Sequence, residues 1–168
     1  MKKTLLAAAL LFAAPTLADN TKKPIKGKGA IYCEFNIDAM TMISRDKGKA
    51  GFDLPAFKEM KEPLRALYLR TDDDNGRAMY RIGHAEGLAI EIKGEWEGKE
   101  VQTVFVEAQK DPHFSATTVF WAAAKGTEIP AVRNTSLSIA GYAAASISYG
   151  TCRKVSHDEA NLLLKTFD

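Results

Sequence analysis

The sequence predicts a mostly β protein, a small antiparallel meander barrel or sandwich of about eight strands with a short C-terminal helix packed on the outside. Three observations predict this class. Apolar residues recur at every second position along most of the chain, turn residues return every 12 to 15 positions between Asp74 and Gly141, and the last residues carry a helix-start signal followed by a helical apolar pattern. With 168 residues, the chain has the length of one domain.

The first 18 residues have the composition of a secretory signal peptide. Lys2 and Lys3 precede an apolar stretch, and Thr16-Leu17-Ala18 offers a small-residue cleavage site. The apolar stretch has about 11 residues, whereas crossing a bilayer takes about 20, so we do not expect it to remain as a membrane anchor. The sequence therefore predicts a bacterial, Sec-type exported chain that is cleaved after Ala18, spans no membrane, and is periplasmic or secreted.

The charge balance argues against nucleic acid as a partner. The full chain has 23 Lys and Arg against 21 Asp and Glu, and cleavage after Ala18 removes two lysines, which leaves the two signs equal. A nucleic-acid binder generally carries a strongly basic surface. Residues 19–29 gather four lysines around Pro24 with one large apolar residue, Ile25, which is typical of a flexible basic tail. A single folded domain is expected over residues 30–168.

The two cysteines, Cys33 and Cys152, are expected to form a disulfide. An exported chain folds in an oxidising compartment, and the sequence has no Cys-x-x-Cys pair that would indicate a redox or metal-binding thiol. The cysteines lie 119 positions apart, near the two ends of the predicted domain. Closing a loop of that length stabilises a fold by roughly 5 kcal/mol in the chain-entropy model, and by about 2 to 4 kcal/mol in typical measurements.

The first predicted strand begins at Ile31. Ile31, Cys33, Phe35 and Ile37 alternate with polar residues, so Cys33 is expected to point into the core. Asp53-Leu54-Pro55 resembles a helix start, which predicts a short helix over residues 56–62 that ends at Pro63. This first strand and the last one, which holds Cys152, would then be tied together, which favours the barrel slightly over the sandwich.

The later strands follow from turn residues near positions 74, 86, 98, 112, 126 and 141. Asp74-Asn75-Gly76 and Glu97-Gly98-Lys99 supply the positive φ angles of tight hairpins. Between the turns, apolar residues stand two apart: Leu67 and Leu69; Ala78, Tyr80 and Ile82; Leu88, Ile90 and Ile92; Val101, Thr103 and Phe105; Leu137 and Ile139; Ile147 and Tyr149. On this pattern, Asp38, Glu91 and Glu107 are expected on the outward positions of their strands.

A helix is expected over residues 156–168. Ser156-His157-Asp158-Glu159 is a capping box, and Ala160, Leu163, Leu164 and Phe167 follow at helical spacing. The segments 101–106 and 114–121 carry apolar residues on both faces, so their outer faces need a cover. We therefore expect the helix to lie outside the sheet, over those two strands.

No catalytic, metal or cofactor site is predicted. The sequence lacks the Gly-x-Ser-x-Gly, His-Glu-x-x-His and Ser-x-x-Lys motifs, and the acidic turn 72–76 lacks the Glu that completes a calcium loop. Met40 and Met42 are two apart, the spacing of a copper(I) pair, but core packing accounts for them equally well. The three histidines, His84, His113 and His157, fall in or beside turns and a helix cap.

The functional hypothesis is an exported, non-catalytic and monomeric interaction module, similar in size to secreted enzyme inhibitors, that binds a protein or an envelope polymer. The alternative is a small-ligand carrier whose apolar interior is lined by Tyr80, Trp96 and Tyr149. An outer-membrane barrel and an enzyme whose site is assembled from scattered residues are weaker alternatives.

Overall fold

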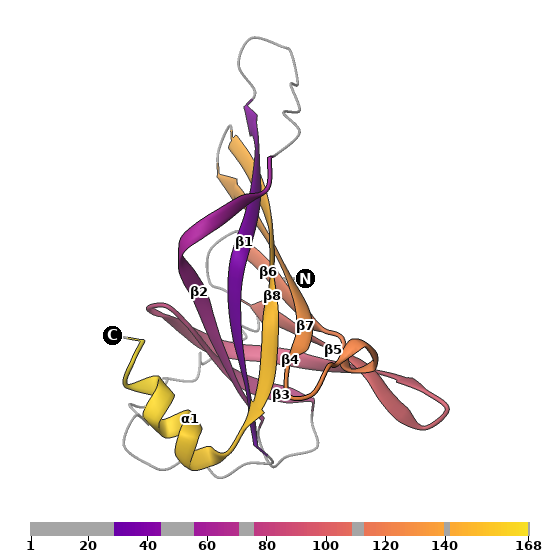
Figure 1. The fold of residues 1–168 in the computed structure, drawn as a ribbon. Coiled ribbons are helices and arrows are strands. Elements are labelled where there is room, and N and C mark those ends of the chain that lie inside the picture. The colour runs from indigo at the N-terminus through magenta and orange to yellow at the C-terminus, as the bar shows by residue number, and fades with distance from the viewer. Residues whose placement is uncertain (1–28, 45–55, 71–75, 109–112, 140–141, 168) are drawn as a thin grey trace, which may run out of the picture.

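In the computed structural model, eight antiparallel strands follow one another in sequence order, and the last pairs with the first to close a barrel (Figure 1). The structure describes residues 29–44, 56–70, 76–108, 113–139 and 142–167. The strands are β1 (Ala30–Ser44), β2 (Lys58–Arg70), β3 (Arg77–Ile82), β4 (Ala85–Trp96), β5 (Lys99–Ala108), β6 (His113–Val119), β7 (Ile129–Ile139) and β8 (Tyr142–Val155). The predicted mostly β class is confirmed. Of the two predicted architectures, barrel and sandwich, the structure is a barrel.

Tight turns make this simple up-and-down order possible. The β4–β5 hairpin turns at Glu97 and Gly98, whose φ angles are +51° and +73°. Two successive positive φ angles are typical of the turn whose twist matches a two-stranded ribbon. The hairpin projects from the side of the barrel as a long ribbon (Figure 1), which places its turn away from the core.

The barrel closes between β1 and β8, and an irregularity in β1 shapes this seam. The pairing register shifts between Phe35 and Ile37. The odd-numbered residues of β1 face inward up to Phe35, whereas the even-numbered residues face inward after the shift. Phe35 is fully buried, whereas Ile37 is exposed, which corrects the expectation that both share the core face. Gly150 faces the shift, and a Cβ atom there would lie 1.9 Å from the carbonyl oxygen of Glu34.

The helix expected over residues 56–62 is not present, because β2 already begins at Lys58. Its presumed cap, residues 53–55, lies outside the described residues. Pro63 sits inside the strand, where the β1–β2 pairing skips from Leu64 to Glu59. A proline has no N–H to donate to the ladder, so it is tolerated where the pairing is interrupted.

The C-terminal helix α1 (His157–Leu164) forms as expected, and the side chain of Ser156 accepts a hydrogen bond from the backbone N–H of Glu159. It does not cover β5 and β6, as the sequence suggested. It packs instead on the outer face of β1 and β2, in a cluster with Tyr32, Leu67 and Leu69. The reason is connectivity: α1 follows β8 directly, and β8 neighbours β1, whereas β5 lies half-way around the barrel.

Candidate functional site

The predicted disulfide is present. Cys33 on β1 and Cys152 on β8 stand directly opposite each other and are bonded across the closing seam. Both side chains are buried in the main core cluster. The disulfide therefore reinforces a contact that the backbone ladder also makes, and it holds the first and last strands of the barrel together.

The three residues that were expected to line a ligand cavity do not come together. Tyr80 is buried inside the barrel, where its ring lies against Gly87. Trp96 is 71% exposed at the end of the β4–β5 hairpin. Tyr149 lies on the outer face of β8, where its ring makes an edge contact with Phe57 at a centroid distance of 5.5 Å. These three positions lie in three separate environments.

The middle of the barrel is filled by side chains. The rings of Tyr68 and Phe105 stack 4.2 Å apart, and both are fully buried together with Phe35 and Ile31. Close packing of this kind is typical of small eight-stranded barrels whose interior is a core.

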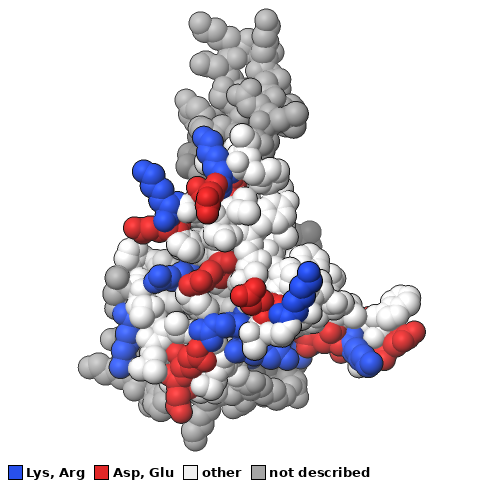
Figure 2. All heavy atoms as spheres, in the orientation of Figure 1, with Lys and Arg blue, Asp and Glu red and all other residues white. Residues whose placement is uncertain are grey.

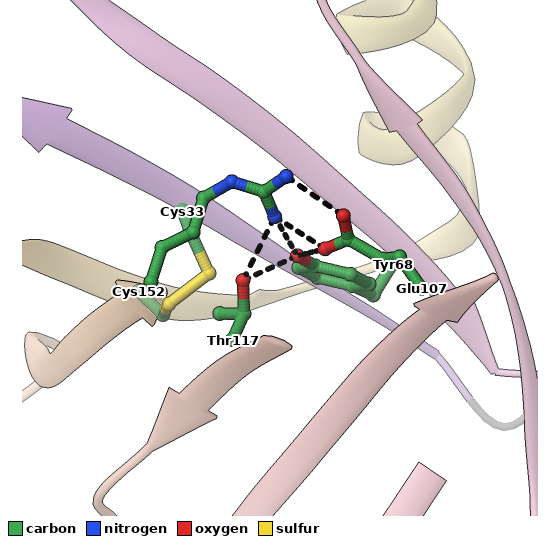
Figure 3. Close-up of a disulfide and its surroundings, with 6 residues drawn as sticks. Cys33, Tyr68, Glu107, Thr117 and Cys152 are labelled. Atoms are coloured by element: carbon green, nitrogen blue, oxygen red, sulfur yellow. Dashed lines mark hydrogen bonds and ion pairs between the residues drawn. A yellow bond between two sulfur atoms is a disulfide. The ribbon is translucent and has the colours of Figure 1, made fainter. Parts of the chain in front are cut away.

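A charged pair lies within this core, formed by Glu107 of β5 and Arg133 of β7. Arg133 Nη2 donates to Glu107 Oε2 at 2.7 Å, and Nη1 forms a second ion pair with Oε1. The hydroxyl of Tyr68 donates to Glu107 Oε1 at 2.6 Å and lies 2.7 Å from the hydroxyl of Thr117. Figure 3 shows the Glu107 carboxylate and the two hydroxyl groups pointing toward one another, close to the disulfide.

Burial and the interactions with Glu107 shift the pKa values of Tyr68 and Arg133. Burial raises the pKa of Tyr68 well above its ordinary value, and the negative charge of Glu107 acts in the same direction. Burial opposes the charge on Arg133, but the hydrogen bonds to Glu107 outweigh it and the pKa of Arg133 is raised. The cluster is thus a charged carboxylate–guanidinium pair beside a neutral phenol, with its charges satisfied by each other.

Trp121 lies in a short 3₁₀ helix, η2 (Trp121–Ala123), which follows β6, and its side chain packs against the main core cluster. The indole Nε1 donates to Thr103 Oγ1 at 2.7 Å. The Lys154 ammonium lies 4.8 Å from the ring centroid, and the Arg70 guanidinium lies 5.9 Å from it. A cation over an indole ring is attracted to its electron-rich face, so these contacts hold the Trp121 ring in its position against the core.

Arg70 also pairs with Glu91 at 2.8 Å and with Glu100 at 3.1 Å. Burial opposes the charge of Glu100, but the hydrogen bond with Thr103 and the charge of Arg70 hold its pKa below its ordinary value.

Asp38, Glu91 and Glu107 were expected to face outward. Glu91 and Glu107 are instead buried inside the barrel, and Asp38 accepts a hydrogen bond from the buried Ser148 at 2.9 Å.

Because Glu91 faces the barrel interior, the apolar residues that alternate with it on β4 face outward. Leu88, Ile90 and Ile92 are 51%, 57% and 52% exposed, and Trp96 continues the same alternating face along the strand. On β5, Val106 stands beside Ile90 and Val104 beside Ile92. We call Leu88, Ile90, Ile92, Trp96, Val104 and Val106 the outer stripe. It runs from the barrel wall to the end of the projecting hairpin, where Figure 2 shows charged side chains around uncharged atoms.

The sequence contains a signal for the outer stripe, because Val104 and Val106 stand opposite an inward-facing Phe105 and indicate an apolar outer face. It contains none for the Glu107–Arg133 pair, whose members lie 26 positions apart and meet only when β6 places Thr117 between β5 and β7. Single charged residues within strands do not reveal which partner they will meet.

Among the described residues, the remaining candidates do not come together in a site. Met40 is exposed, and nothing is described of the Met42 side chain. His84 lies in the β3–β4 turn, whereas His113 and His157 begin β6 and α1. The acidic turn 72–75 lies outside the described residues.

Within the described ranges, no three His, Cys, Asp or Glu side chains gather where they could hold a metal ion. In the same part of the chain, no helix has the length and apolar character needed to cross a membrane.

Comparison with protein-family models, with curated proteins and with solved structures finds no match to this chain.

Proposed function

We propose that the chain is an exported, non-catalytic interaction protein that binds a partner protein on the outer stripe of the β4–β5 ribbon. The observation that carries this proposal is the exposure of Leu88, Ile90, Ile92 and Trp96, each more than half exposed on one face of one strand. Contiguous apolar surface of this kind is rare on proteins that act alone, and it generally marks a binding surface.

Trp96 is the expected anchor of the interface. Tryptophan is enriched among the few interface residues that supply most of the binding energy, because one ring fills a partner's pocket and excludes water. The ring stands at the end of a projecting hairpin, beside the turn at Glu97 and Gly98. A projecting hairpin reaches into a concave surface that the barrel wall does not enter.

The rest of the barrel supports a binding role more than a role as carrier or enzyme. Its centre is filled by the stacked rings of Tyr68 and Phe105, which is the space that a carried ligand would need. The buried side chains of Glu107 and Arg133 form an ion pair with each other, so their charges are engaged within the barrel and do not face a substrate or ligand. A rigid support of this kind lowers the entropy lost when the hairpin binds.

Export is part of the proposal. The signal-like residues 1–18 and the Cys33–Cys152 disulfide both fit an oxidising compartment outside the cytoplasm. The partner is therefore sought among exported proteins of the same cell or of its surroundings.

The test places a photoreactive amino acid at position 96 of the full exported chain, with the same group at the exposed position 62 on β2 as a control. We expect one discrete cross-linked protein from position 96 and none from position 62. After the cross-linked protein is purified, Trp96→Ala should weaken its binding at least about tenfold, as expected for an anchor residue. Equal cross-linking from both positions, or unchanged affinity of the variant, would contradict the proposal.

A further inference from the structure

We infer that the partner protein binds the projecting hairpin by strand addition, with an extended segment of the partner hydrogen-bonded to the open edge of β4 at residues 92–96. The inference rests on the proposed function because it assigns the mode of recognition at the same hairpin. It also gives the chemistry of the segment, which carries an apolar residue opposite Gly94 and a basic residue opposite Glu95.

One edge of β4 is open where the hairpin leaves the barrel (Figure 1). β4 and β5 pair along the whole hairpin. On its other side, β4 pairs with β3 only as far as Ile90, and the Glu91 N–H then donates to the carbonyl of Gly76 at 2.6 Å. Among the described residues, none pairs with residues 92–96 on this side. An open edge offers backbone donors and acceptors that an extended segment can take up as an added strand.

The alternation of the strand identifies the residues that face the open edge. In an antiparallel strand, the N–H and C=O groups of one residue point to one side, and those of the next residue point to the other side. The Glu91 N–H points toward β3, so the backbone groups of Lys93 and Glu95 point the same way. Those of Ile92 and Gly94 point toward β5. Lys93 and Glu95 therefore offer two donors and two acceptors to an added strand.

The edge of β5 is less suited to strand addition than the edge of β4. β5 pairs with β6 only from Thr103 onward, so the start of β5 also lacks a neighbour on that side among the described strands. The register shift beside Gly94, however, gives β5 one additional residue, Val101, which has no register partner on β4. Such a bulge distorts a strand edge and disfavours pairing with another strand. β4 contains no additional residue, so its alternation continues to the turn.

The face that carries the outer stripe favours an apolar residue in the added strand. The residue opposite Gly94 would place its side chain on this face, between Ile92 and Trp96. Ile92 and Trp96 are both more than half exposed, and the side chain of Gln102 lies against Gly94 from β5. An apolar side chain at this point would remove apolar surface of both neighbours from water. It would also support the projecting ribbon, because two strands alone are only marginally stable.

The opposite face favours a basic residue in the added strand. Glu95 stands directly opposite Glu100 on this face, and like charges at directly opposite positions repel each other. Arg70 pairs with Glu100 and with Glu91, whereas Glu95 is exposed beside the open edge. A basic residue opposite Glu95 would be attracted to it, and Lys93, two positions away, would repel that residue more weakly because of the greater distance. An acidic residue there would instead meet two carboxylates.

The first experiment selects peptides from a display library of random short sequences on the immobilised mature chain, as the wild type and as Lys93→Pro. Proline removes a backbone donor from the open edge but leaves the β4–β5 hydrogen bonds in place, since the N–H of residue 93 points away from β5. We expect the wild type to enrich peptides with alternating apolar residues and an intervening basic residue, and Lys93→Pro to enrich none of these. The matched variant Lys93→Ala removes the same charge but keeps the N–H, so it should still enrich them.

Backbone methylation of a selected peptide is the decisive measurement. In an added strand, every second N–H group of the peptide points to β4 and the others point to solvent. N-methylation should therefore weaken binding to the wild-type chain about tenfold or more at every second residue, and less than about twofold at the residues between them. Titration calorimetry measures the affinities. Because this pattern is measured on the wild type, it decides the question even where Lys93→Pro does not fold.

Two outcomes would overturn strand addition. One is a wild type that enriches no peptides beyond those that Lys93→Pro enriches while that variant has the wild-type circular dichroism spectrum. The other is a selected peptide that tolerates methylation equally at all positions, because its binding would then depend on side chains alone.

The two proposals fail separately. If the protein that is cross-linked from position 96 binds Lys93→Pro and Lys93→Ala with equal affinity, strand addition is wrong and the proposed function stands. If selected peptides show the alternating methylation pattern but position 96 cross-links no protein, the edge binds extended segments and the proposed function is contradicted.

Discussion

Glu107 and Arg133 show how a single pair of residues sets the character of the barrel interior. Their side chains are buried among aromatic and apolar groups, and each is satisfied by the other and by hydroxyl groups. A buried ion pair adds little net stability, since the loss of hydration offsets the attraction, but one charge without its partner is strongly destabilising. The pair therefore makes the interior sensitive to changes at either position.

The first prediction tests this dependence. Arg133→Met should lower the free energy of unfolding by about 3 to 5 kcal/mol, because it leaves the Glu107 carboxylate buried without its cation. The double change Arg133→Met with Glu107→Met should recover most of that loss, since Tyr68 and Thr117 still hydrogen-bond to each other. Denaturant unfolding measures both. If the single variant is as stable as the wild type, the buried pair does not have this role.

The second prediction concerns Glu100, whose pKa lies below its ordinary value in the folded protein. A lowered folded pKa gives stability that is present above the pKa of the unfolded chain, about 4.3, and is lost as the pH falls through the folded value. Glu100→Gln should therefore reduce stability at neutral pH but change it little in strong acid. Urea unfolding at several pH values measures this, with Glu97→Gln in the exposed turn as the control. A pH-independent difference between Glu100→Gln and the wild type would refute the prediction.

At the scale of elements, the seam between β1 and β8 depends on a position without a side chain. Gly150 faces the register shift in β1, and a Cβ atom there would meet two backbone atoms of β1, 1.9 Å and 2.6 Å away. Backbone cannot move aside as the tip of a flexible side chain does. The seam closes tightly only because residue 150 is glycine.

The third prediction follows from that contact. Gly150→Ala should lower the free energy of unfolding by about 2 kcal/mol or more, because one of the two strands must be displaced. Thr151→Ala, at the exposed neighbouring position, should change stability by less than about 0.5 kcal/mol. Thermal unfolding of the two variants measures the difference. Equal stability of Gly150→Ala and Thr151→Ala would contradict the tight approach of the strands.

At the scale of the whole molecule, the disulfide and the hydrogen-bonded ladder close the barrel at the same place. Because Cys33 and Cys152 are paired neighbours across β1 and β8, the disulfide joins strands that already hold each other. Its main effect is on the unfolded chain, where it links residues separated by 119 positions. The folded barrel is therefore expected to persist without it.

The fourth prediction separates these two effects. Replacing both cysteines with alanine should lower the free energy of unfolding by about 2 to 4 kcal/mol while the strand content stays unchanged. Circular dichroism measures the strand content, and denaturant unfolding with and without reductant measures the stability. Reductant should bring the wild type down to the level of the variant and leave the variant unaffected. A variant that is unfolded in the absence of denaturant would show that the disulfide is needed for the fold itself.

The sequence by itself determined what depends on neighbouring residues. The alternation of apolar residues predicted the strands, Glu97-Gly98 predicted a tight hairpin, and Ser156 with Glu159 predicted the cap of α1. The cysteine pair was predicted because two cysteines in an oxidising compartment have one intramolecular way to pair. The strands, the hairpin and the cap depend on residues close together in the sequence, and the two cysteines have only each other to pair with. These features can therefore be predicted without knowing the tertiary packing.

Only the tertiary structure decided which face of each strand is inside. Alternation identifies two faces, but a shift of one residue exchanges them, and β4 places Glu91 inside and Ile90 outside. The inward charges are acceptable because Arg70 and Arg133 reach them from β2 and β7, which are distant in sequence. The place of α1 was set likewise by the neighbour of β8 in the closed barrel. These features depend on contacts between distant strands, and such contacts exist only after the barrel has closed.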